Sequence, residues 1–140
     1  THAGLAAGLA AMNMDPARVR SFAVLSPAED ARRTTLDLAR ATLALLDDRM
    51  SIAAAAIDVA GDQLGEGYGI PTPAMFEAVR LMARTEGLLL DPVYSGKAFA
   101  GLLADIRHGA CQTGDAILFV MTGGVPGLFA YRRAFEEPAR

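Results

Sequence analysis

Two glycine-bearing turns, each following an apolar run, constrain this chain more than any other feature. Residues 91–97 read Asp-Pro-Val-Tyr-Ser-Gly-Lys, and residues 121–127 read Met-Thr-Gly-Gly-Val-Pro-Gly. Each turn carries side-chain hydroxyls at the end of a segment that we expect to be buried. In α/β folds, cofactor sites are built at such positions. The pair of turns therefore predicts an enzyme.

Helix and strand patterns alternate along the chain. We predict helices at residues 3–12, 28–48, 73–88 and 97–108, and strands at residues 19–25, 57–60 and 115–121. The segment that begins at Ile52 stays ambiguous, because its four consecutive alanines favour helix. The alternation indicates an α/β fold with a mainly parallel sheet, without an internal repeat or linker.

Three of the predicted helices begin with a capping signal. Thr1 stands at the N-cap of the first, Ser26-Pro27-Ala28-Glu29 reads as a capping box, and Thr72-Pro73 opens the third. Helical spacing predicts which apolar side chains face the core. They are Leu36, Ala39, Leu43 and Leu46, then Met75, Val79, Leu81, Met82 and Leu88, and finally Phe99, Leu102, Leu103 and Ile106.

Composition excludes several classes of protein. The net charge of -3 and the scattered arginines argue against nucleic-acid binding. We expect no membrane span, because Asp58 and Asp62 interrupt the apolar run from Ile52, and no signal peptide, because the start lacks a basic region. The single cysteine, Cys111, predicts neither an internal disulfide nor a metal site. The cytoplasm is the expected location.

Four side chains are candidates for ligand binding on chemical grounds. Thr1 opens a helix whose N-terminus favours a phosphate, although a plain N-cap is the more common explanation of such a threonine. Thr122 precedes Gly123 and presents a hydroxyl where a ligand can approach the backbone, or else it only caps the following turn. Tyr68 and Tyr94 lie in glycine-containing loops and can stack on a ring or donate a proton, or can be ordinary core tyrosines.

Taken together with Thr1-His2-Ala3-Gly4 and residues 65–71 (Gly-Glu-Gly-Tyr-Gly-Ile-Pro), these turns resemble the D-cysteine desulfhydrase and 1-aminocyclopropane-1-carboxylate (ACC) deaminase family of pyridoxal-phosphate (PLP) enzymes. The motifs occur in family order across nearly the whole chain, and the resemblance is weakest at residues 26–57. It implies an α/β chain that is part of a three-layer, parallel-sheet PLP-binding domain of tryptophan-synthase-β-like fold (fold type II). Residues 1–140 would form its C-terminal portion, without the N-terminal part that carries the Schiff-base lysine.

The resemblance also implies a role for each candidate residue. Thr1 would hold the PLP phosphate, and Thr122 with Gly123 would hold the pyridine nitrogen. A neutral threonine leaves that nitrogen largely unprotonated, which favours elimination over transamination. Tyr94 would do acid-base work and contact the substrate, and Tyr68 would stack or contact the substrate. No metal is implied.

Three further positions refine this interpretation. Lys97 is the only lysine, but the family places its Schiff-base lysine upstream, so we predict a structural or electrostatic role for Lys97. Ser95, a predicted cofactor-binding residue, stands where the deaminase branch has Glu, and Thr122 stands where that branch has Leu. Both match the desulfhydrase branch. Met121 departs from the His that this branch commonly carries there.

The sequence therefore predicts a PLP-dependent β-eliminating lyase that converts D-cysteine to pyruvate, ammonia and hydrogen sulfide. The expected partners are a small amino-acid substrate, the N-terminal part of the same protein and a second subunit in a homodimer. The chain by itself is expected to be inactive. L-cysteate sulfo-lyase and ACC deaminase activities are alternatives, as is a non-catalytic, truncated α/β binding module.

Overall fold

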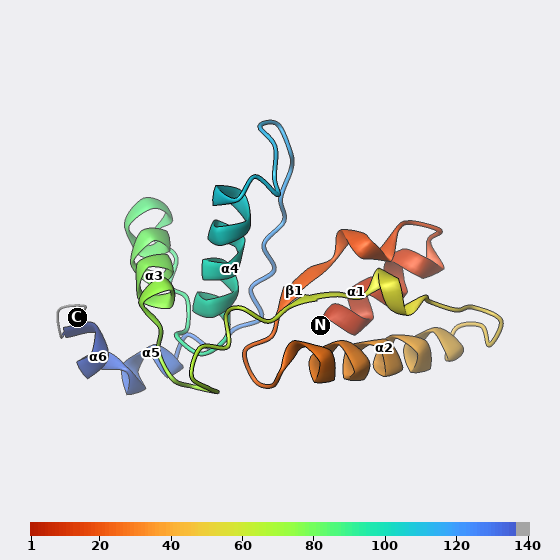
Figure 1. The fold of residues 1–140 in the computed structure, drawn as a ribbon, viewed down its shortest axis with the longest axis horizontal. Coiled ribbons are helices and arrows are strands. Elements are labelled where there is room, and N and C mark those ends of the chain that lie inside the picture. Colours follow the sequence, from red (N-terminus) through yellow and green to blue (C-terminus); the bar gives the residue numbers. More distant parts are fainter. Residues whose placement is uncertain (137–140) are drawn as a thin grey trace.

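Helices and two short strands succeed one another along an elongated body (Figure 1). The computed structural model describes residues 1–136. The α-helices are α1 (His2–Ala11), α2 (Ala28–Ala44), α3 (Pro73–Glu86), α4 (Ser95–Arg107), α5 (Gly127–Ala130) and α6 (Arg132–Glu136). Two 3-10 helices, η1 (Pro16–Arg18) and η2 (Ala54–Ala56), precede the strands β1 (Arg20–Phe22) and β2 (Asp58–Ala60).

The two strands pair in parallel, as predicted. Their register places Arg20 opposite Asp58 and Phe22 opposite Ala60. Arg20 also joins the sheet to α4, because its guanidinium contacts Asp58 at 2.7 Å and Asp105 at 2.6 Å. Strand β1 covers only part of the predicted range 19–25, since a strand extends only as far as its partner offers hydrogen bonds.

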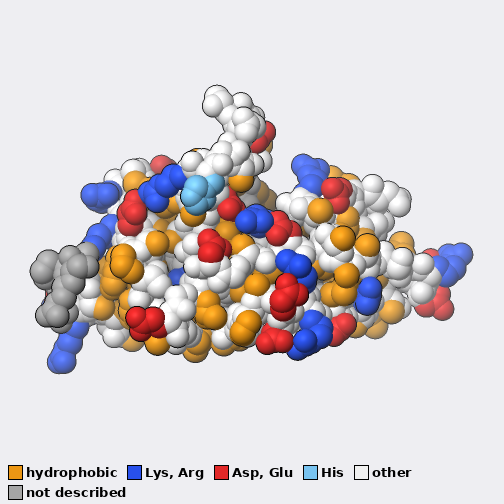
Figure 2. All heavy atoms as spheres, in the orientation of Figure 1, with side chains coloured by type: hydrophobic (Ala, Val, Ile, Leu, Met, Phe, Trp, Pro, Cys, Tyr) orange, Lys and Arg blue, Asp and Glu red, His pale blue; other side chains and the backbone are white. Residues whose placement is uncertain are grey.

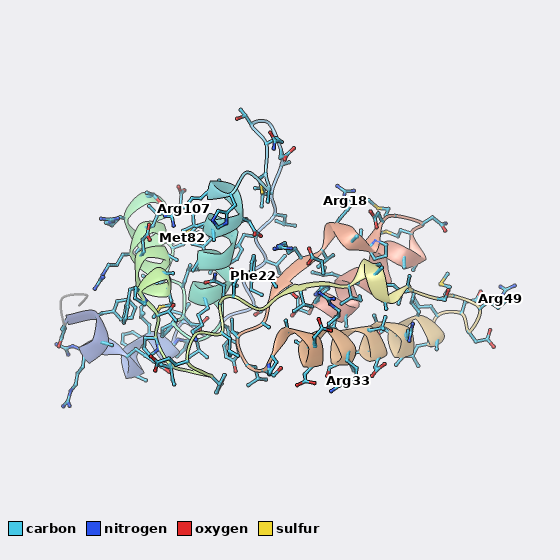
Figure 3. All side chains as sticks on the ribbon, viewed as in Figure 1. Arg18, Phe22, Arg33, Arg49, Met82 and Arg107 are labelled. Carbon is cyan, nitrogen blue, oxygen red and sulfur yellow. The ribbon has the colours of Figure 1, made fainter. Side chains whose placement is uncertain are left out.

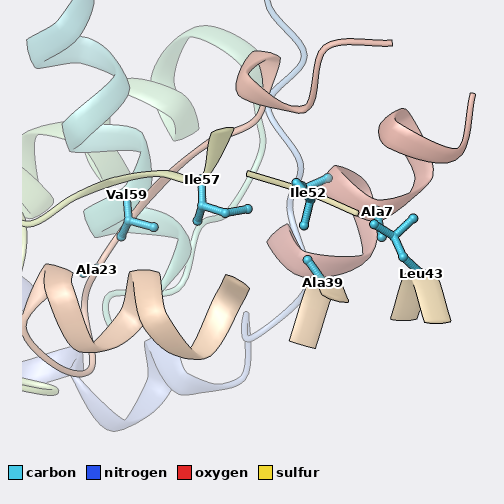
Figure 4. Close-up of a cluster of buried hydrophobic side chains, with 8 residues drawn as sticks. Ala7, Ala23, Ala39, Leu43, Ile52, Ile57 and Val59 are labelled. Atoms are coloured by element: carbon cyan, nitrogen blue, oxygen red, sulfur yellow. The ribbon is translucent and has the colours of Figure 1, made fainter. Parts of the chain in front are cut away.

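One apolar cluster packs α1 and α2 against the strands (Figure 4). Its small side chains let the elements approach closely, since Ala6, Ala7 and Ala39 are all fully buried. Larger side chains fill the remaining space. They are Leu43, Ile52, Ile57 and Val59.

A second apolar cluster packs α3 against α4. Met75, Val79, Met82 and Leu90 form it, and Phe99 and Phe119 are among the rings packed on it. The inward face of α4 differs from the prediction, because Ile106 is 43% exposed and the buried positions are Ser95, Gly96, Lys97, Ala100 and Gly101. Small residues are needed there, since the ring of Phe22 from β1 occupies the space that a side chain at Gly101 would fill (Figure 3).

The predicted strand at residues 115–121 was wrong for this structure. No part of that segment joins a ladder within residues 1–136, and Leu118 is 87% exposed. Only Phe119 turns inward, with its ring centroid 5.3 Å from that of Phe99. A strand needs a hydrogen-bonding neighbour as well as apolar side chains, and here the described chain supplies no neighbour.

Two local predictions for α2 were also wrong. Pro27, not Ser26, occupies the N-cap position, and it forms no side-chain capping bond, so the capping box does not form. The helix ends at Ala44, which leaves Leu46 64% exposed instead of buried. Ala39 and Leu43 are fully buried as predicted.

Candidate active site

The turn before α4 is built around the buried carboxylate of Asp91, which is 2% exposed. Its Oδ2 accepts hydrogen bonds from the backbone N–H of Val93 (2.8 Å) and Tyr94 (2.7 Å). Its Oδ1 accepts from the backbone N–H (2.7 Å) and the hydroxyl (2.6 Å) of Ser95. These bonds satisfy donors at the start of a helix, where no intrahelical acceptor exists. Asp91 thereby fixes the backbone on which Tyr94 stands.

The charge of Asp91 is maintained by these donors. Burial alone would raise the pKa of the carboxyl group, but the hydrogen bonds from Ser95, Tyr94 and Val93 outweigh burial and lower it. The adjacent Gly96 allows the close packing of this turn on α3, because an added side chain would lie 2.7 Å from both the Asp91 carbonyl oxygen and Val79 Cγ2. Sequence reasoning missed Asp91 as a site-building residue, although an Asp-Pro pair shortly before a helix is a capping signal.

Tyr94 meets Tyr68 at the surface of this turn. Their hydroxyl oxygens are 2.6 Å apart, and the ring centroids are 5.9 Å apart with the planes tilted by 55°. Both side chains are about half exposed, at 46% and 50%. The hydrogen bond to Tyr68 raises the pKa of Tyr94, with smaller contributions from burial and from the Asp91 charge. Tyr94 therefore keeps its phenolic proton at neutral pH.

Glycine and a buried lysine shape the loop that carries Tyr68. Gly65 adopts φ 66°, and a side chain there would lie 2.6 Å from Thr72 Cγ2. The ammonium group of Lys97 donates hydrogen bonds to the carbonyl oxygens of Leu64 (2.7 Å) and Gly67 (3.2 Å). The other end of the loop is held by Tyr131, whose hydroxyl donates to the carbonyl oxygen of Gly69 at 2.6 Å. Neither Tyr131 nor this use of Lys97 was foreseen from the sequence.

The Thr122 turn lies against the same Asp91. Gly123 and Gly124 both adopt left-handed backbone conformations, with φ 103° and 97°. A side chain on Gly124 would meet Asp91 Cγ at 2.9 Å, whereas one on Gly123 would meet nothing within 4 Å. Thr122 is exposed. The Thr122 turn thus packs on the turn that carries Tyr94, with open space beside Gly123.

Thr1 lies on a separate element, at the N-cap of α1. It forms no side-chain capping bond, and the first turn of α1 contains no acidic residue. The neighbouring His2 bonds Ser21 in β1, with 2.7 Å between Nδ1 and Oγ. Within residues 1–136, no hydrogen bond joins Thr1 to the loops of Tyr68, Tyr94 and Thr122. The structure thus brings the two tyrosines and the Thr122 turn together, and it leaves Thr1 as a free helix terminus.

The described residues contain no group of three or more His, Cys, Asp and Glu side chains that could hold a metal ion. None of the helices in residues 1–136 is both long and apolar enough to cross a membrane. On the face drawn in Figure 2, basic and acidic side chains are interspersed.

The comparison with known families identifies the class of protein. Residues 1–123 match the family described as pyridoxal-phosphate dependent enzyme. The chain therefore belongs to this family, and its fold is the α/β PLP-binding fold of type II.

Two relatives and one solved structure show which members of this family the chain resembles. The chain is 43% identical over 131 residues to the D-cysteine desulfhydrases of Salmonella paratyphi C (strain RKS4594) and Salmonella choleraesuis (strain SC-B67), an alignment that covers 94% of this chain and 39% of each relative. A crystal structure of an ACC deaminase homologue superposes with a TM-score of 0.81 at 31% identity, covering 97% of this chain and 40% of that one. The chain thus spans about two fifths of the length of these relatives.

The residues present fit the PLP cofactor of this family. The N-terminus of α1, with a free threonine hydroxyl and no acidic side chain in its first turn, suits a phosphate. The open space at Gly123 and the exposed Thr122 hydroxyl suit a ring nitrogen, which requires one polar partner and close access to backbone. The paired tyrosines present two aromatic rings and a hydrogen-bonded phenol beside this turn.

Proposed function

We propose that the complete protein is a PLP-dependent lyase that converts D-cysteine and water to pyruvate, ammonia and hydrogen sulfide. The observation that carries this proposal is the Tyr68–Tyr94 pair, in which Tyr94 retains its proton on a turn that Asp91 fixes and that the Thr122 turn packs against. The identity of 43% to two D-cysteine desulfhydrases supports the choice of substrate.

In the proposed site, residues of this chain bind the cofactor and move a proton to the leaving group. The bound cofactor supplies an electron sink for cleavage at the α-carbon of the amino acid. Thr1 and the N-terminus of α1 bind its phosphate, and the Thr122 hydroxyl bonds its ring nitrogen. Tyr94 donates its phenolic proton to the sulfur that leaves the β-carbon, and Tyr68 orients that phenol.

Ser95 has a mainly structural position in this site. Its hydroxyl donates to Asp91 Oδ1 and accepts from the Asp91 backbone N–H at 2.8 Å. A hydroxyl oxygen has one further lone pair, so contact with the cofactor is compatible with these two bonds. The predicted cofactor-binding role of Ser95 remains a proposal, and its bond to Asp91 gives it a second role in fixing Tyr94.

ACC deaminase activity is the second candidate, because the solved structure reported above is an ACC deaminase homologue. Assays of the complete protein with three substrates distinguish the candidate activities by their products. D-cysteine should release sulfide, L-cysteate would release sulfite, and ACC would give 2-oxobutanoate. Release of 2-oxobutanoate without sulfide would contradict the proposal, and failure of PLP to bind would favour a non-catalytic module.

We further propose that the complete protein is a cytoplasmic homodimer. Large apolar side chains are widely exposed on residues 1–136, with Leu45 at 86%, Leu118 at 87% and Phe129 at 77%. Apolar exposure of this kind is expected where further protein covers the surface. Light scattering on the complete protein tests the proposal, and a monomeric mass at micromolar concentration would contradict it.

A further inference from the structure

Lys97 is a charged side chain buried in the interior of the described chain. Its side chain is fully buried, at 0% exposure, and burial lowers the pKa of its ammonium group. No carboxylate within residues 1–136 forms an ion pair with it. Its described partners are two backbone carbonyl oxygens, of Leu64 at 2.7 Å and Gly67 at 3.2 Å.

These two carbonyl groups belong to the loop that carries Tyr68. Gly67 directly precedes Tyr68, and a side chain added to Gly65 would lie 3.9 Å from the Lys97 ammonium. The cation therefore binds the inner side of the loop over several residues. An ammonium group has three donors and suits this task, because it can bond more than one carbonyl oxygen.

Lys97 also stands on the element that carries the other tyrosine. It lies in the first turn of α4, three residues after Tyr94, and Asp91 fixes the start of that helix. The ammonium group thus links the Tyr94 helix to the Tyr68 loop on the inside. The bond of 2.6 Å between the two phenols links them on the outside.

A buried ammonium without a carboxylate partner costs stability, and an apolar side chain of similar length would fill the same space at lower cost. Stability alone therefore does not explain a lysine at this position. We propose that Lys97 is a positioning residue that holds the Tyr68 loop so that Tyr68 bonds Tyr94. This inference rests on the proposed function insofar as Tyr94 acts on the leaving group.

The first test is a double-mutant cycle in the complete, PLP-loaded protein. Lys97→Met removes all three donors and keeps the length of the side chain. In the wild-type background, Lys97→Met should lower kcat about tenfold and leave KM within about twofold, because it acts through Tyr68. In a Tyr68→Phe background, the same substitution should lower kcat by less than about a further twofold. Arg84→Met, which removes an exposed cation from α3, should have no effect. Equal losses in both backgrounds, or no loss in either, would overturn the proposal.

The second test does not depend on activity. NMR of protein labelled at tyrosine Cζ follows the ionisation of Tyr94, and its resonance is assigned by its loss in Tyr94→Phe. In the wild type, Tyr94 should ionise at a higher pH than an ordinary tyrosine. In Lys97→Met, the pH at which Tyr94 ionises should fall back toward that of an ordinary tyrosine. An unchanged Tyr94 titration in folded Lys97→Met would refute the positioning role, even if D-cysteine proves not to be the substrate.

Lys97→Gln provides the conservative comparison, because its amide keeps N–H donors without a charge. It should retain part of the Tyr94 shift and part of kcat. Thermal unfolding of each variant shows whether the fold is intact. If neither variant folds, Lys97 is a residue of the core and the proposal fails.

Discussion

Gly124 lies directly against the carboxylate of Asp91, and this contact joins the two turns that stand out in the sequence. A side chain on Gly124 would reach Asp91 Cγ at 2.9 Å and Oδ1 at 3.0 Å. The same carboxylate binds the backbone N–H of Tyr94. One buried anion therefore sets the position of the Thr122 turn relative to the tyrosine that we propose as the proton donor.

The Asp91–Gly124 contact gives a matched pair of substitutions. Gly124→Ala should displace Asp91 and also strain a left-handed backbone, while Gly123→Ala, with similar φ and open space around it, should cause the strain alone. We expect Gly123→Ala to lower the free energy of unfolding by about 1–3 kcal/mol and Gly124→Ala to lower it further. Turnover should fall for both variants, because Gly123 borders the space proposed for the cofactor ring, so the two are compared by their stability. Denaturant unfolding of both variants checks this, and equal values would contradict the contact.

Asp91 should make stability depend on acidic pH. Its pKa is lower in the folded than in the unfolded protein, so its contribution is complete above the unfolded pKa and is lost as the pH falls through the folded value. Asp91→Asn keeps the shape but removes the charge that four donors share, and should lower the free energy of unfolding by about 1–3 kcal/mol at neutral pH. Unfolding measured as a function of pH should show a smaller acid-dependent loss in the variant. If the free energy of unfolding depends on pH in the same way in both proteins, the ionisation of Asp91 does not stabilise the fold.

The helix that precedes this site was predictable, because its signals are local. Thr72 accepts a hydrogen bond from the backbone N–H of Met75 at 3.2 Å, and Pro73 follows at the first helical position, as the sequence indicated. Gly87 ends α3 in a left-handed conformation. Such caps involve neighbours within a few residues, so composition and spacing suffice to place them.

The parts of the site that were not predictable depend on contacts between distant residues. Lys97 bonds carbonyl groups about thirty residues upstream, and nothing in its own neighbourhood indicates this. The apolar run 115–121 failed as a strand for a related reason, because its pattern cannot specify a hydrogen-bonding neighbour. The two tyrosines could be proposed as site residues from their loops, but their direct bond required the fold.

Tyr94 should act as a general acid in the proposed lyase reaction. Replacement by Phe in the complete protein should lower kcat for D-cysteine about a hundredfold to ten-thousandfold with PLP still bound, the range of general acid-base catalysis. Because Tyr68 raises the pKa of Tyr94, Tyr68→Phe should move the alkaline limb of the rate profile to lower pH. Sulfide release measured against pH checks both variants. Near-wild-type turnover of Tyr94→Phe would reduce this residue to a packing role.

Lys97 should not react with PLP, since its ammonium group is buried and bound to two carbonyl oxygens. Borohydride treatment of this chain with PLP, followed by peptide mass spectrometry, should give no stoichiometric label on Lys97. The complete protein should be labelled on another lysine, and Lys97→Met should leave that labelling unchanged. A stoichiometric label on Lys97 would disprove the structural assignment.

Substitutions of Thr122 test whether this turn contacts the ring nitrogen of the cofactor. A neutral hydroxyl leaves that nitrogen largely unprotonated, whereas a carboxylate in its place would stabilise the protonated form and strengthen the ring as an electron sink. In the complete protein, Thr122→Asp should therefore raise the yield of pyridoxamine phosphate relative to sulfide, with PLP binding retained. Thr122→Ala should weaken PLP binding by about 0.5–1.5 kcal/mol, the net value of one hydrogen bond, without changing that product ratio.

The control for Thr122 is Thr113→Asp, which adds the same charge to an exposed threonine in the loop after α4. It should leave both the product ratio and PLP affinity unchanged, because a solvent-exposed charge outside the site is largely screened. The measurement is the ratio of sulfide to pyridoxamine phosphate at one pH, with bound PLP verified by its absorbance. If Thr122→Asp binds PLP and its ratio equals that of the wild type, Thr122 does not contact the ring nitrogen. The glycines at 123 and 124 would then serve only to let the turn pack on Asp91.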